Sequence, residues 1–512
     1  MRLGRLNGPV LFKDVTVFDG EALNCHWSVM TENGKVTFQG SNEDFGEVKA
    51  TVIDCRGFSL IPSFKDSHLH LLGNAARLTG KDIASSVFND IPEVLGELKK
   101  TKDEMFFGGW LRCYGYDDSQ IKSGRALTRW DLDQIYPDSP VIIYSSSGHS
   151  ALINSCGLAK LSISECSDEP NGITFDRDLE TGNLNGVILE GNSYIENYLP
   201  KISNERLRNN LKYSFQQFLS RGVTQVTDAT ESNDVDRLNF LSTELDRLEG
   251  MVDVEFMPGL NMLDELGQFK ISYGSNYNSL SIGPVKIMLS SSSGRFVPEP
   301  QDLLEFVTEC HGRGYPVAIH AITENEIDLC LSIFSKSSLR GDRIEHASEL
   351  RDDQIKKIAK LGLWISTQPG FIYHRGDQYI SKLNGLDLNL LYRLRSLEIS
   401  GVNVGGSSDA PVTVADPINS IYASMTRQTS GKQVLNEDES LNIIQSLKMF
   451  TVNNSTISAG RQKLSGVSTG DTLDAVILNN DISSLRAEDF KDINVFATVK
   501  NGEIKYVAEV EA

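Results

Sequence analysis

The stretch SLIPSFKDSHLH, residues 59–70, decides the fold. Its apolar first half is typical of a buried strand, and it ends on Asp66, His68 and His70. Alternate side chains of a strand point the same way, so His68 and His70 face one direction. Two imidazoles at this spacing can share one divalent ion such as zinc, and Asp66 could orient one of them. The stretch therefore predicts a buried strand with metal ligands at its carboxyl end, although a pair of ordinary histidines would fit these residues alone.

Seven further stretches downstream read as short apolar strands. They are VTQVTDA, VDVEFMPGL, GPVKIML, YPVAIHA, DRIEHA, LWISTQP and VNVGGSSDA. Amphipathic stretches such as QDLLEFVTECHGRG, ENEIDLCLSIFSK, RDDQIKKIAKLG and NLLYRLRSLEISG lie between strands and have apolar residues at helical spacing. Strands alternating with helices predict a parallel sheet of the α/β class, and eight such units predict a closed (β/α)8 barrel.

Both ends of the chain read as strands and tight turns. The first sixty residues contain an ENGK hairpin signal, and the tail contains LDAVILNND and VFATVKNGEIKYVAEV. Because chain termini often meet, residues 1–60 and 466–512 are expected to form one small β-domain, with the barrel over residues 61–465. An insertion at about 71–219 contains PVIIYSSSGHSALINS, expected to be a strand running into a loop, and such insertions often serve as lids or bind substrate.

The bulk composition excludes some classes of function. The 512 residues are 40% hydrophobic and 23% charged with a formal net charge of −20, which argues against a nucleic-acid partner. No apolar run is long enough to span a membrane, no secretory leader opens the chain, and the seven cysteines show no CxxC pair, so we expect a cytoplasmic protein. A small molecule is the expected partner, and the sequence leaves the oligomeric state open, a homo-oligomer included.

Three more candidate ligands end predicted barrel strands, where this fold presents catalytic groups. The chain has eight histidines, and His320 ends YPVAIHA while His346 ends DRIEHA. Asp409 ends the last strand, where a buried carboxylate needs a nearby cation. We interpret Asp409 as a metal ligand and proton shuttle, with a helix N-cap as the alternative.

Lys286 lies in the predicted fourth strand, GPVKIML, whose apolar flanks place its side chain in the barrel. A free ammonium beside metal ions would be repelled, so something must neutralise it. A salt bridge to Asp228 or Glu255 would be one solution.

The ordered set DSHLH, VKI, AIHA, RIEHA and SSDAPV resembles the amidohydrolase superfamily, in particular the branch containing N-substituted formamide deformylase. The resemblance extends over LTRWDLDQIYPDSPVIIYSSSGHSALINS and LDAVILN, and so covers nearly the whole chain. It implies a flanking β-sandwich, one metal on His68, His70 and Asp409, and another on His320 and His346. It also implies that carbon dioxide carboxylates Lys286 to a carbamate bridging both ions.

Two features depart from the family pattern. Ser63 and Lys65 stand where a glycine and an apolar residue are usual, and Lys286 is followed by IMLSSSSGR where the branch commonly has Asp-Gly-Ser. The second departure bears on how the loop after Lys286 contacts a substrate.

The expected function is hydrolysis of an amide-type C–N bond, other than a peptide bond, in a small molecule. A divalent ion lowers the pKa of bound water to about 7 and so makes hydroxide available, and Asp409 can pass a proton to the leaving nitrogen. His149 and His374 are candidate substrate-binding residues, whereas His26 and His311 are expected to be structural. A cyclic-amide hydrolase of the dihydroorotase or hydantoinase kind, or a binding protein without catalysis, would be the alternatives, and zinc in one or two copies the expected metal.

Overall fold

The computed structural model divides the chain into two compact units, Met1–Leu71 with Ser214–Ala512, and Leu72–Tyr213. The structure describes residues 4–45, 49–83, 88, 90–101, 106–116, 125–145, 148, 150–170, 172–291, 294–383, 385–459 and 466–509. None of the helices in these ranges is long and apolar enough to cross a membrane.

The first parallel sheet of the larger unit begins with the strand that carries the HxH pair. Its parallel strands are, in spatial order, β7 (Phe64–Leu69), β15 (Val223–Asp228), β16 (Asp253–Phe256) and β18 (Leu280–Ile282). The short β17 (Asn276–Tyr277) pairs antiparallel with β18 at the edge. All six residues of β15 are buried, as expected of a strand covered on both faces.

The second parallel sheet carries the other candidate ligands. Its strands are β19 (Val285–Met288), β20 (Val317–Ala321), β21 (Arg343–His346), β22 (Trp364–Thr367) and β23 (Val404–Gly406). The predicted fourth strand does not belong to the first sheet, because Gly283 and Pro284 separate β18 from β19. Proline has no N–H to donate, which interrupts a ladder at this point.

Backbone hydrogen bonds outside the ladders link the two sheets on both sides. The amide of Lys286 donates to the carbonyl of Pro258 at 2.8 Å, and the amide of Asp409 donates to the carbonyl of His68 at 2.9 Å. The α/β class predicted from the sequence is confirmed. The strands pair as two open sheets, so the structure does not show the single closed sheet that the predicted (β/α)8 barrel requires.

Helices follow the strands, as the apolar spacing predicts. They include α7 (Val235–Arg247), α9 (Pro300–Gly312), α10 (Glu324–Phe334), α11 (Asp352–Leu361), α12 (Gly370–Lys382), α14 (Leu394–Ile399), α15 (Pro417–Thr426), α16 (Ile443–Phe450) and α17 (Val452–Ile457). Thr323 and Glu326 form a capping box at the start of α10. Gly362, at φ 67°, ends α11 in the left-handed conformation that glycine adopts without strain.

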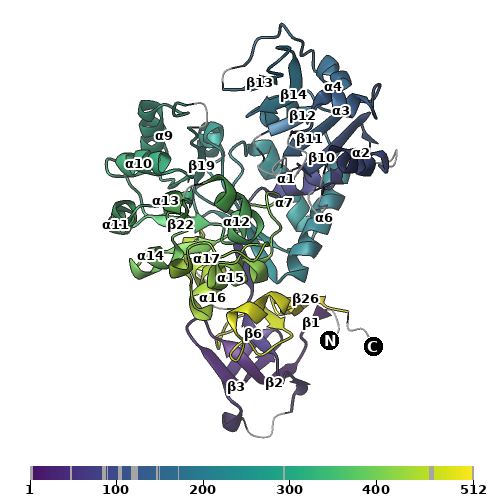
Figure 1. Ribbon diagram of the computed structural model, residues 1–512. Helices are drawn as coiled ribbons and strands as arrows, with labels where there is room; N and C mark the ends of the chain where they lie inside the picture. The colour runs from purple at the N-terminus through teal and green to yellow at the C-terminus, as the bar shows by residue number, and fades with distance from the viewer. Residues whose placement is uncertain are drawn as a thin grey trace. The chain divides into compact units, whose positions relative to one another are not determined.

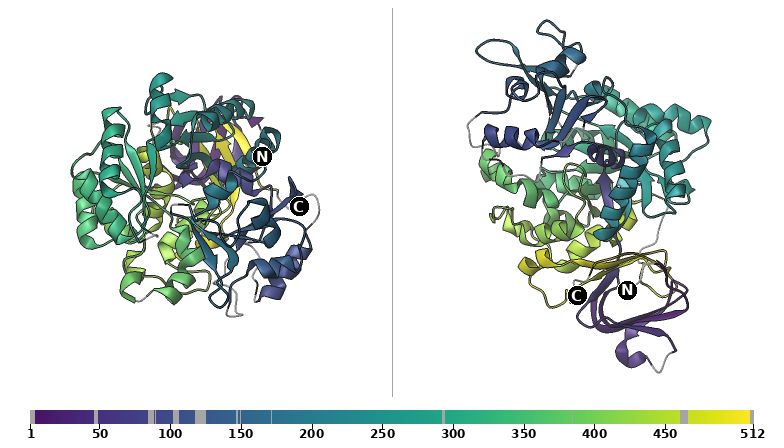
Figure 2. Two further views of the ribbon diagram at one scale, coloured as in Figure 1. Left: turned by 90° about the horizontal axis from the view of Figure 1, so that it is seen from above. Right: turned by 90° about the vertical axis from the view of Figure 1, so that its right-hand side faces the viewer.

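The two ends of the chain join in one nine-stranded sheet (Figures 1 and 2). Its strands, in spatial order, are β1 (Gly4–Arg5), β26 (Glu503–Val507), β25 (Val495–Lys500), β24 (Ala475–Leu478), β6 (Ser59–Pro62), β2 (Pro9–Phe18), β3 (Leu23–Glu32) and β4 (Lys35–Ser41), with β5 (Thr51–Asp54) beside β2. Asn33 and Gly34 both have positive φ in the β3–β4 turn, as the ENGK signal predicts. The sandwich implied by the resemblance stays a prediction.

The smaller unit has its own seven-stranded sheet. It runs β13 (Thr174–Arg177), β14 (Leu184–Leu189), β12 (Ser150–Ile153), β11 (Val141–Ser145), β10 (Trp110–Tyr116) and β8 (Lys81–Asp82), with β9 (Phe106–Phe107) beside β10. The stretch PVIIYSSSGHSALINS is predicted as a strand entering a loop; β11 is that strand, and a second strand, β12, follows in the same stretch and pairs antiparallel with it. Its apolar residues on both sides of the serine run are buried in that sheet.

Candidate metal centre

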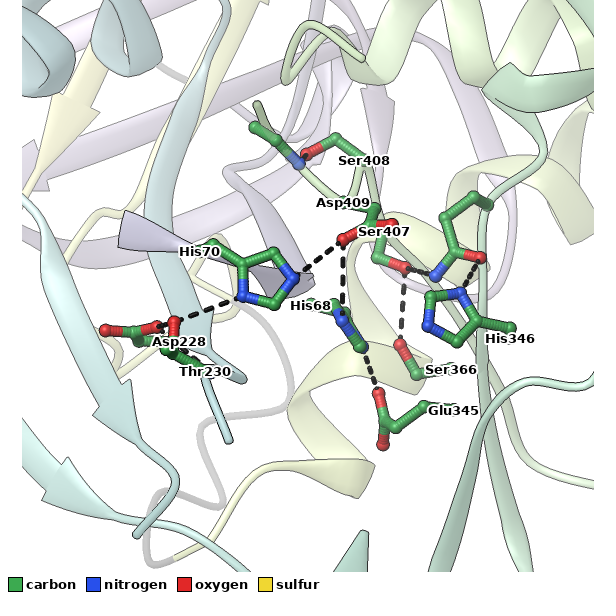
Figure 3. A network of polar contacts seen from close by, with 12 residues as sticks. His68, His70, Asp228, Thr230, Glu345, His346, Ser366, Ser407, Ser408 and Asp409 are labelled. Carbon is green, nitrogen blue, oxygen red and sulfur yellow. Dashed lines mark hydrogen bonds and ion pairs between the residues drawn. The ribbon is translucent and has the colours of Figure 1, made fainter. Parts of the chain in front are cut away.

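The centre is built where β7 and β23 end (Figure 3). His68 lies on β7 and is 1% exposed, His70 follows the strand, and Asp409 lies three residues beyond β23. The amide of Asp409 donates to the carbonyl of His68, and the amide of His70 donates to the carbonyl of Ala410 at 2.7 Å. These two bonds hold the acid beside both histidines, although Asp409 has a left-handed φ of 57°. Such a conformation is uncommon in a non-glycine residue, and aspartate tolerates it better than most.

One carboxylate oxygen faces two ring nitrogens. Oδ1 of Asp409 lies 3.2 Å from Nε2 of His70 and 3.6 Å from Nε2 of His68. The ligand atoms of these three residues lie within 4.8 Å of one another. Oδ1 is buried and accepts no geometrically sound hydrogen bond from the described residues. A buried carboxylate oxygen without a donor is costly, and a cation in contact with it removes the cost.

Nδ1 of His68, the ring nitrogen that does not face Asp409, contacts a buried ion pair formed by Glu345 and Arg343. Nδ1 of His68 lies 2.5 Å from Oε2 of Glu345, which also binds the guanidinium of Arg343. Burial alone would raise the pKa of Glu345, but Arg343 and His68 lower it well below its ordinary range. A carboxylate can only accept, so Nδ1 carries the proton and Nε2 is left with a lone pair. Burial lowers the pKa of His68 to about 3, which keeps this imidazole neutral.

His70 is oriented by a hydroxyl. Its Nδ1 lies 3.1 Å from Oγ1 of Thr230, and that hydroxyl donates to Oδ1 of Asp228 at 2.7 Å. Since the hydroxyl proton is used by Asp228, Oγ1 accepts from Nδ1–H, and Nε2 faces Asp409. Burial lowers the pKa of His70, but Asp409 raises it more, so the net shift is upward. A metal ion and a proton would therefore compete for this Nε2.

The electrostatics of Asp409 fit a ligand. Burial raises the pKa of Asp409. The contact with His70 and the charges of His68 and His346 lower this pKa by more, so the net pKa lies below the ordinary value. The residue is therefore an anion throughout the neutral range. An anionic oxygen and two Nε2 lone pairs converge, which is the donor set that zinc prefers.

His346 and His320 lie beside this group from the second sheet. The ring centroids of His320 and His346 are 4.4 Å apart, and those of His346 and His68 are 4.8 Å apart. His346 ends β21 with a left-handed φ of 71°, and its Nδ1 lies 2.9 Å from Oε1 of Gln368. The four histidines predicted to bind metal therefore form one continuous cluster.

Lys286, on β19, is 2% exposed. Burial lowers its pKa and Arg343 lowers it further, while Glu345, Asp409 and Glu231 raise it. The alternative considered for Lys286 was a salt bridge to Asp228 or Glu255. Among the residues that the structure describes, no carboxylate oxygen of Asp228 or Glu255 lies within 4.0 Å of Nζ of Lys286, so this salt bridge is not formed.

Asp66 plays a different part from the one predicted. Its Oδ1 accepts the backbone amides of His68 and Ser408, both at 3.2 Å, and binds neither ring. Burial raises the pKa of this acid to about 7. Asp66 thus ties the end of β7 to the loop after β23, and the groups that hold the imidazoles are Glu345, Thr230 and Gln368.

Sequence reasoning missed those three residues. Glu345 offered a signal, because it lies in the buried strand β21 two residues from Arg343, on the same face. An acid and a base at this spacing in an apolar strand must be paired. Thr230 and Gln368 are uncharged loop residues and offered no such signal.

Two further histidines, His149 and His374, are predicted to bind substrate. His149 lies outside the described residues. His374 is exposed on α12 with its ring 5.2 Å from that of Tyr373. Within the described part of the chain, no hydrogen bond or ion pair connects His374 to the metal cluster.

The sequence pattern of the amidohydrolase family matches residues 51–506 of the chain. The chain belongs to the amidohydrolase family. The resemblance inferred from the sequence is therefore confirmed, and the family and its neighbours point to a metal-dependent hydrolase.

Three similar proteins cover nearly the full length. The N-substituted formamide deformylase of Arthrobacter pascens is 23% identical over 94% of this chain and 95% of its own. The crystal structure of an uncharacterized metal-dependent hydrolase from Pyrococcus horikoshii OT3 has a TM-score of 0.73 at 25% identity, over 94% of this chain and 99% of that one. A metal-dependent hydrolase from Pyrococcus furiosus shares the fold, with a TM-score of 0.70 at 23% identity over 94% of this chain and 100% of its own.

Proposed function

We propose that this protein hydrolyses an amide-type C–N bond, other than a peptide bond, in a small molecule. The observation that carries the proposal is the buried Oδ1 of Asp409, which faces two Nε2 atoms and accepts no hydrogen bond from the described residues. The 23% identity to a formamide deformylase over most of both chains supports this bond type.

His68, His70 and Asp409 would hold one divalent ion, zinc being the expected one, and His320 and His346 a second. When bound, such an ion supplies a Lewis acid and lowers the pKa of water from about 15.7 to about 7. The imidazoles of His68, His70 and His346 contribute unprotonated Nε2 atoms because their Nδ1 protons are engaged elsewhere. Asp409 contributes the base, taking a proton at its carboxylate and returning it to the leaving nitrogen, which would otherwise depart as a poor leaving group.

Lys286 is proposed to carry a carbamate. Its buried ammonium would repel metal ions, whereas a carbamate is anionic and would attract them. The neutral amine adds to carbon dioxide, an N–C bond forms, and one proton is lost. A crystal structure grown with bicarbonate should show the added carboxylate, and a bare lysine there would refute this part.

The two open sheets are proposed to be the halves of one (β/α)8 barrel, joined by the backbone hydrogen bonds beside β7 and β19, with β18 and β19 as two segments of its fourth strand. The flanking sheet from residues 1–60 and 466–512 would be the β-sandwich domain, and residues 71–219 the insertion. His149, in that insertion, and His374 remain proposed substrate residues.

A substrate panel tests the proposal. Zinc- and manganese-loaded protein would be assayed with N-formyl, N-acyl, carbamate and cyclic-imide compounds, with Asp409→Asn at matched metal content as the control. Turnover of linear N-acyl compounds that the control lacks is the expected result. Turnover of cyclic imides alone would favour a cyclic-amide hydrolase, and metal-loaded protein inert on every class would contradict catalysis on C–N bonds.

A further inference from the structure

A chain of buried polar groups runs behind His346 (Figure 3). Oε1 of Gln368 lies 2.9 Å from Nδ1 of His346, and Nε2 of Gln368 donates to Oγ of Ser407 at 3.0 Å. Oγ of Ser407 in turn donates to the carbonyl of Thr367 at 2.9 Å. Gln368 and Ser407 are completely buried, so water does not compete for these bonds.

The bond from the Ser407 hydroxyl to the carbonyl of Thr367 sets the direction of the other bonds in this chain. A backbone carbonyl can only accept, so the single hydroxyl proton of Ser407 goes to Thr367. Oγ of Ser407 is then an acceptor, and the amide of Gln368 must turn its NH2 group toward it. The amide oxygen is thereby turned toward His346, where it can only accept. Nδ1 of His346 must carry the proton, and Nε2 keeps its lone pair.

The other two oriented histidines are held differently. His68 binds a carboxylate, which accepts through either oxygen, and the hydroxyl behind His70 is also backed by a carboxylate. Rotating the carboxylate behind His68 leaves it an acceptor, and the carboxylate behind His70 receives the hydroxyl proton of Thr230. The amide behind His346 has one donating and one accepting end, so its orientation determines the tautomer of the ring.

We propose that Gln368 and Ser407 are positioning residues, and that Ser407 fixes the tautomer of His346 by fixing the orientation of the Gln368 amide. The inference rests on the proposed function in so far as His346 is taken to be a metal ligand. Without the Ser407 hydroxyl, the buried NH2 group has no acceptor, which is costly. Rotation of the amide lets NH2 donate to Nδ1, and the ring then carries its proton on Nε2, the metal-binding atom.

The substitution Ser407→Ala tests this inference, with Ser366→Ala as the matched control. Ser366 also donates to Ser407, at 3.3 Å, but its removal leaves the bonds of Gln368 in place. In metal-free protein labelled with ¹⁵N-histidine, the His346 ring should change from the Nδ1–H to the Nε2–H tautomer in Ser407→Ala and stay unchanged in the control. Zinc affinity should fall by about 10–100-fold in Ser407→Ala, the usual effect of losing such a supporting group.

A rescue separates this effect from general damage. Gln368→Glu in the Ser407→Ala background has two accepting oxygens and should return the proton to Nδ1. If Ser407→Ala does not fold, Gln368→Leu replaces it and should give a mixture of both tautomers. An unchanged His346 tautomer in a folded variant would overturn the inference. The wild-type protein could also bind neither zinc nor manganese while Ser407→Ala still changes the tautomer of His346. That result would support the positioning role of Ser407 and Gln368 and overturn the proposed function instead.

Discussion

The two ends of strand β7 differ in how their polar groups are satisfied. At the amino end, Lys65 donates to Ser455 at 2.5 Å and Thr224 donates to Ser63 at 2.7 Å. At the carboxyl end, Oδ1 of Asp409 is buried beside two ring nitrogens and accepts no hydrogen bond within the described ranges. The side chains of Ser63 and Lys65 thus have hydrogen-bond partners at the amino end, whereas Oδ1 of Asp409 has none among the described residues at the carboxyl end, where a cation would supply the missing contact.

The amino end also explains a departure of the sequence from its family. Ser63 and Lys65 replace a glycine and an apolar residue, and both have partners on neighbouring elements. Asn454 reinforces the same region by donating to the carbonyl of Lys65. These polar residues hold α17 and β15 to the start of β7, which is a structural use.

The largest expected effect follows from a substitution at Asp409, whose carboxylate is proposed to act as the base. Asp409→Asn keeps the size of the side chain but loses the basic oxygen, so kcat on an amide substrate should fall by about 10²–10⁴-fold. The metal should be partly retained, since an amide oxygen can still coordinate. Kinetics at matched metal content measure the effect. An activated ester, whose leaving group needs no proton, should show a smaller loss, and equal activity of both proteins on an amide would reduce Asp409 to a helix cap.

The second prediction concerns the amino end of the parallel sheet, where a substitution should change the free energy of unfolding but not zinc affinity. Lys500, 1% exposed, binds Asp253 at 2.9 Å and joins the terminal sheet to β16. Lys500→Met removes the cation of this buried ion pair, so the free energy of unfolding should fall by up to about 3–5 kcal/mol. Denaturant unfolding measures it. Adding Asp253→Leu should recover most of the loss, and a change in zinc affinity in Lys500→Met would break the distinction between the two ends.

How far the sequence predicted the molecule depends on the range of the contacts. The spacing of His68 and His70 is local, and strand alternation alone predicts that they face together. The ENGK hairpin is local as well. The α/β class follows from the alternation of strands and helices, but the separation of β18 from β19 at Gly283 and Pro284 was not foreseen, because a strand's partner is set by tertiary structure.

The groups that hold the imidazoles were beyond prediction for a related reason. Glu345 reaches His68 across 277 positions of sequence, and β7 and β21 are not paired strands. Sequence reasoning assigned the orienting role to Asp66 because it is near in sequence. In a buried site the partner that matters is near in space, and here Asp66 binds backbone amides instead.

A smaller effect on metal binding should follow from Thr230→Val. The substitution keeps the shape of the side chain but removes the hydroxyl that accepts from Nδ1 of His70. Zinc affinity should fall by about 10–100-fold, which a competition assay with a chromogenic chelator would measure. Thr224→Val, at the amino end of the same sheet, is the matched control and should leave zinc affinity unchanged. Equal losses in both variants would argue against a specific role for Thr230.

The smallest effect concerns pH. Because Asp409 raises the pKa of His70 above its usual value, a proton occupies Nε2 of His70 at mildly acidic pH and excludes the metal. Zinc affinity should be constant above that pKa and fall by about tenfold per pH unit below it. Calorimetric titrations at several pH values measure this slope and the release of one proton per ion. An affinity independent of pH between 5 and 8, roughly the range in which histidine titrates, would contradict it.

The central claim is that the carboxyl end of β7 is a metal site, and the metal content of purified variants tests it most directly. Wild-type protein and Lys500→Met should carry divalent metal after incubation with zinc or manganese and removal of excess ion. His68→Ala and His70→Ala should have lost most of it, because each lacks one ligand nitrogen. Wild type and histidine variants that are equally empty, or equally loaded, would contradict the account.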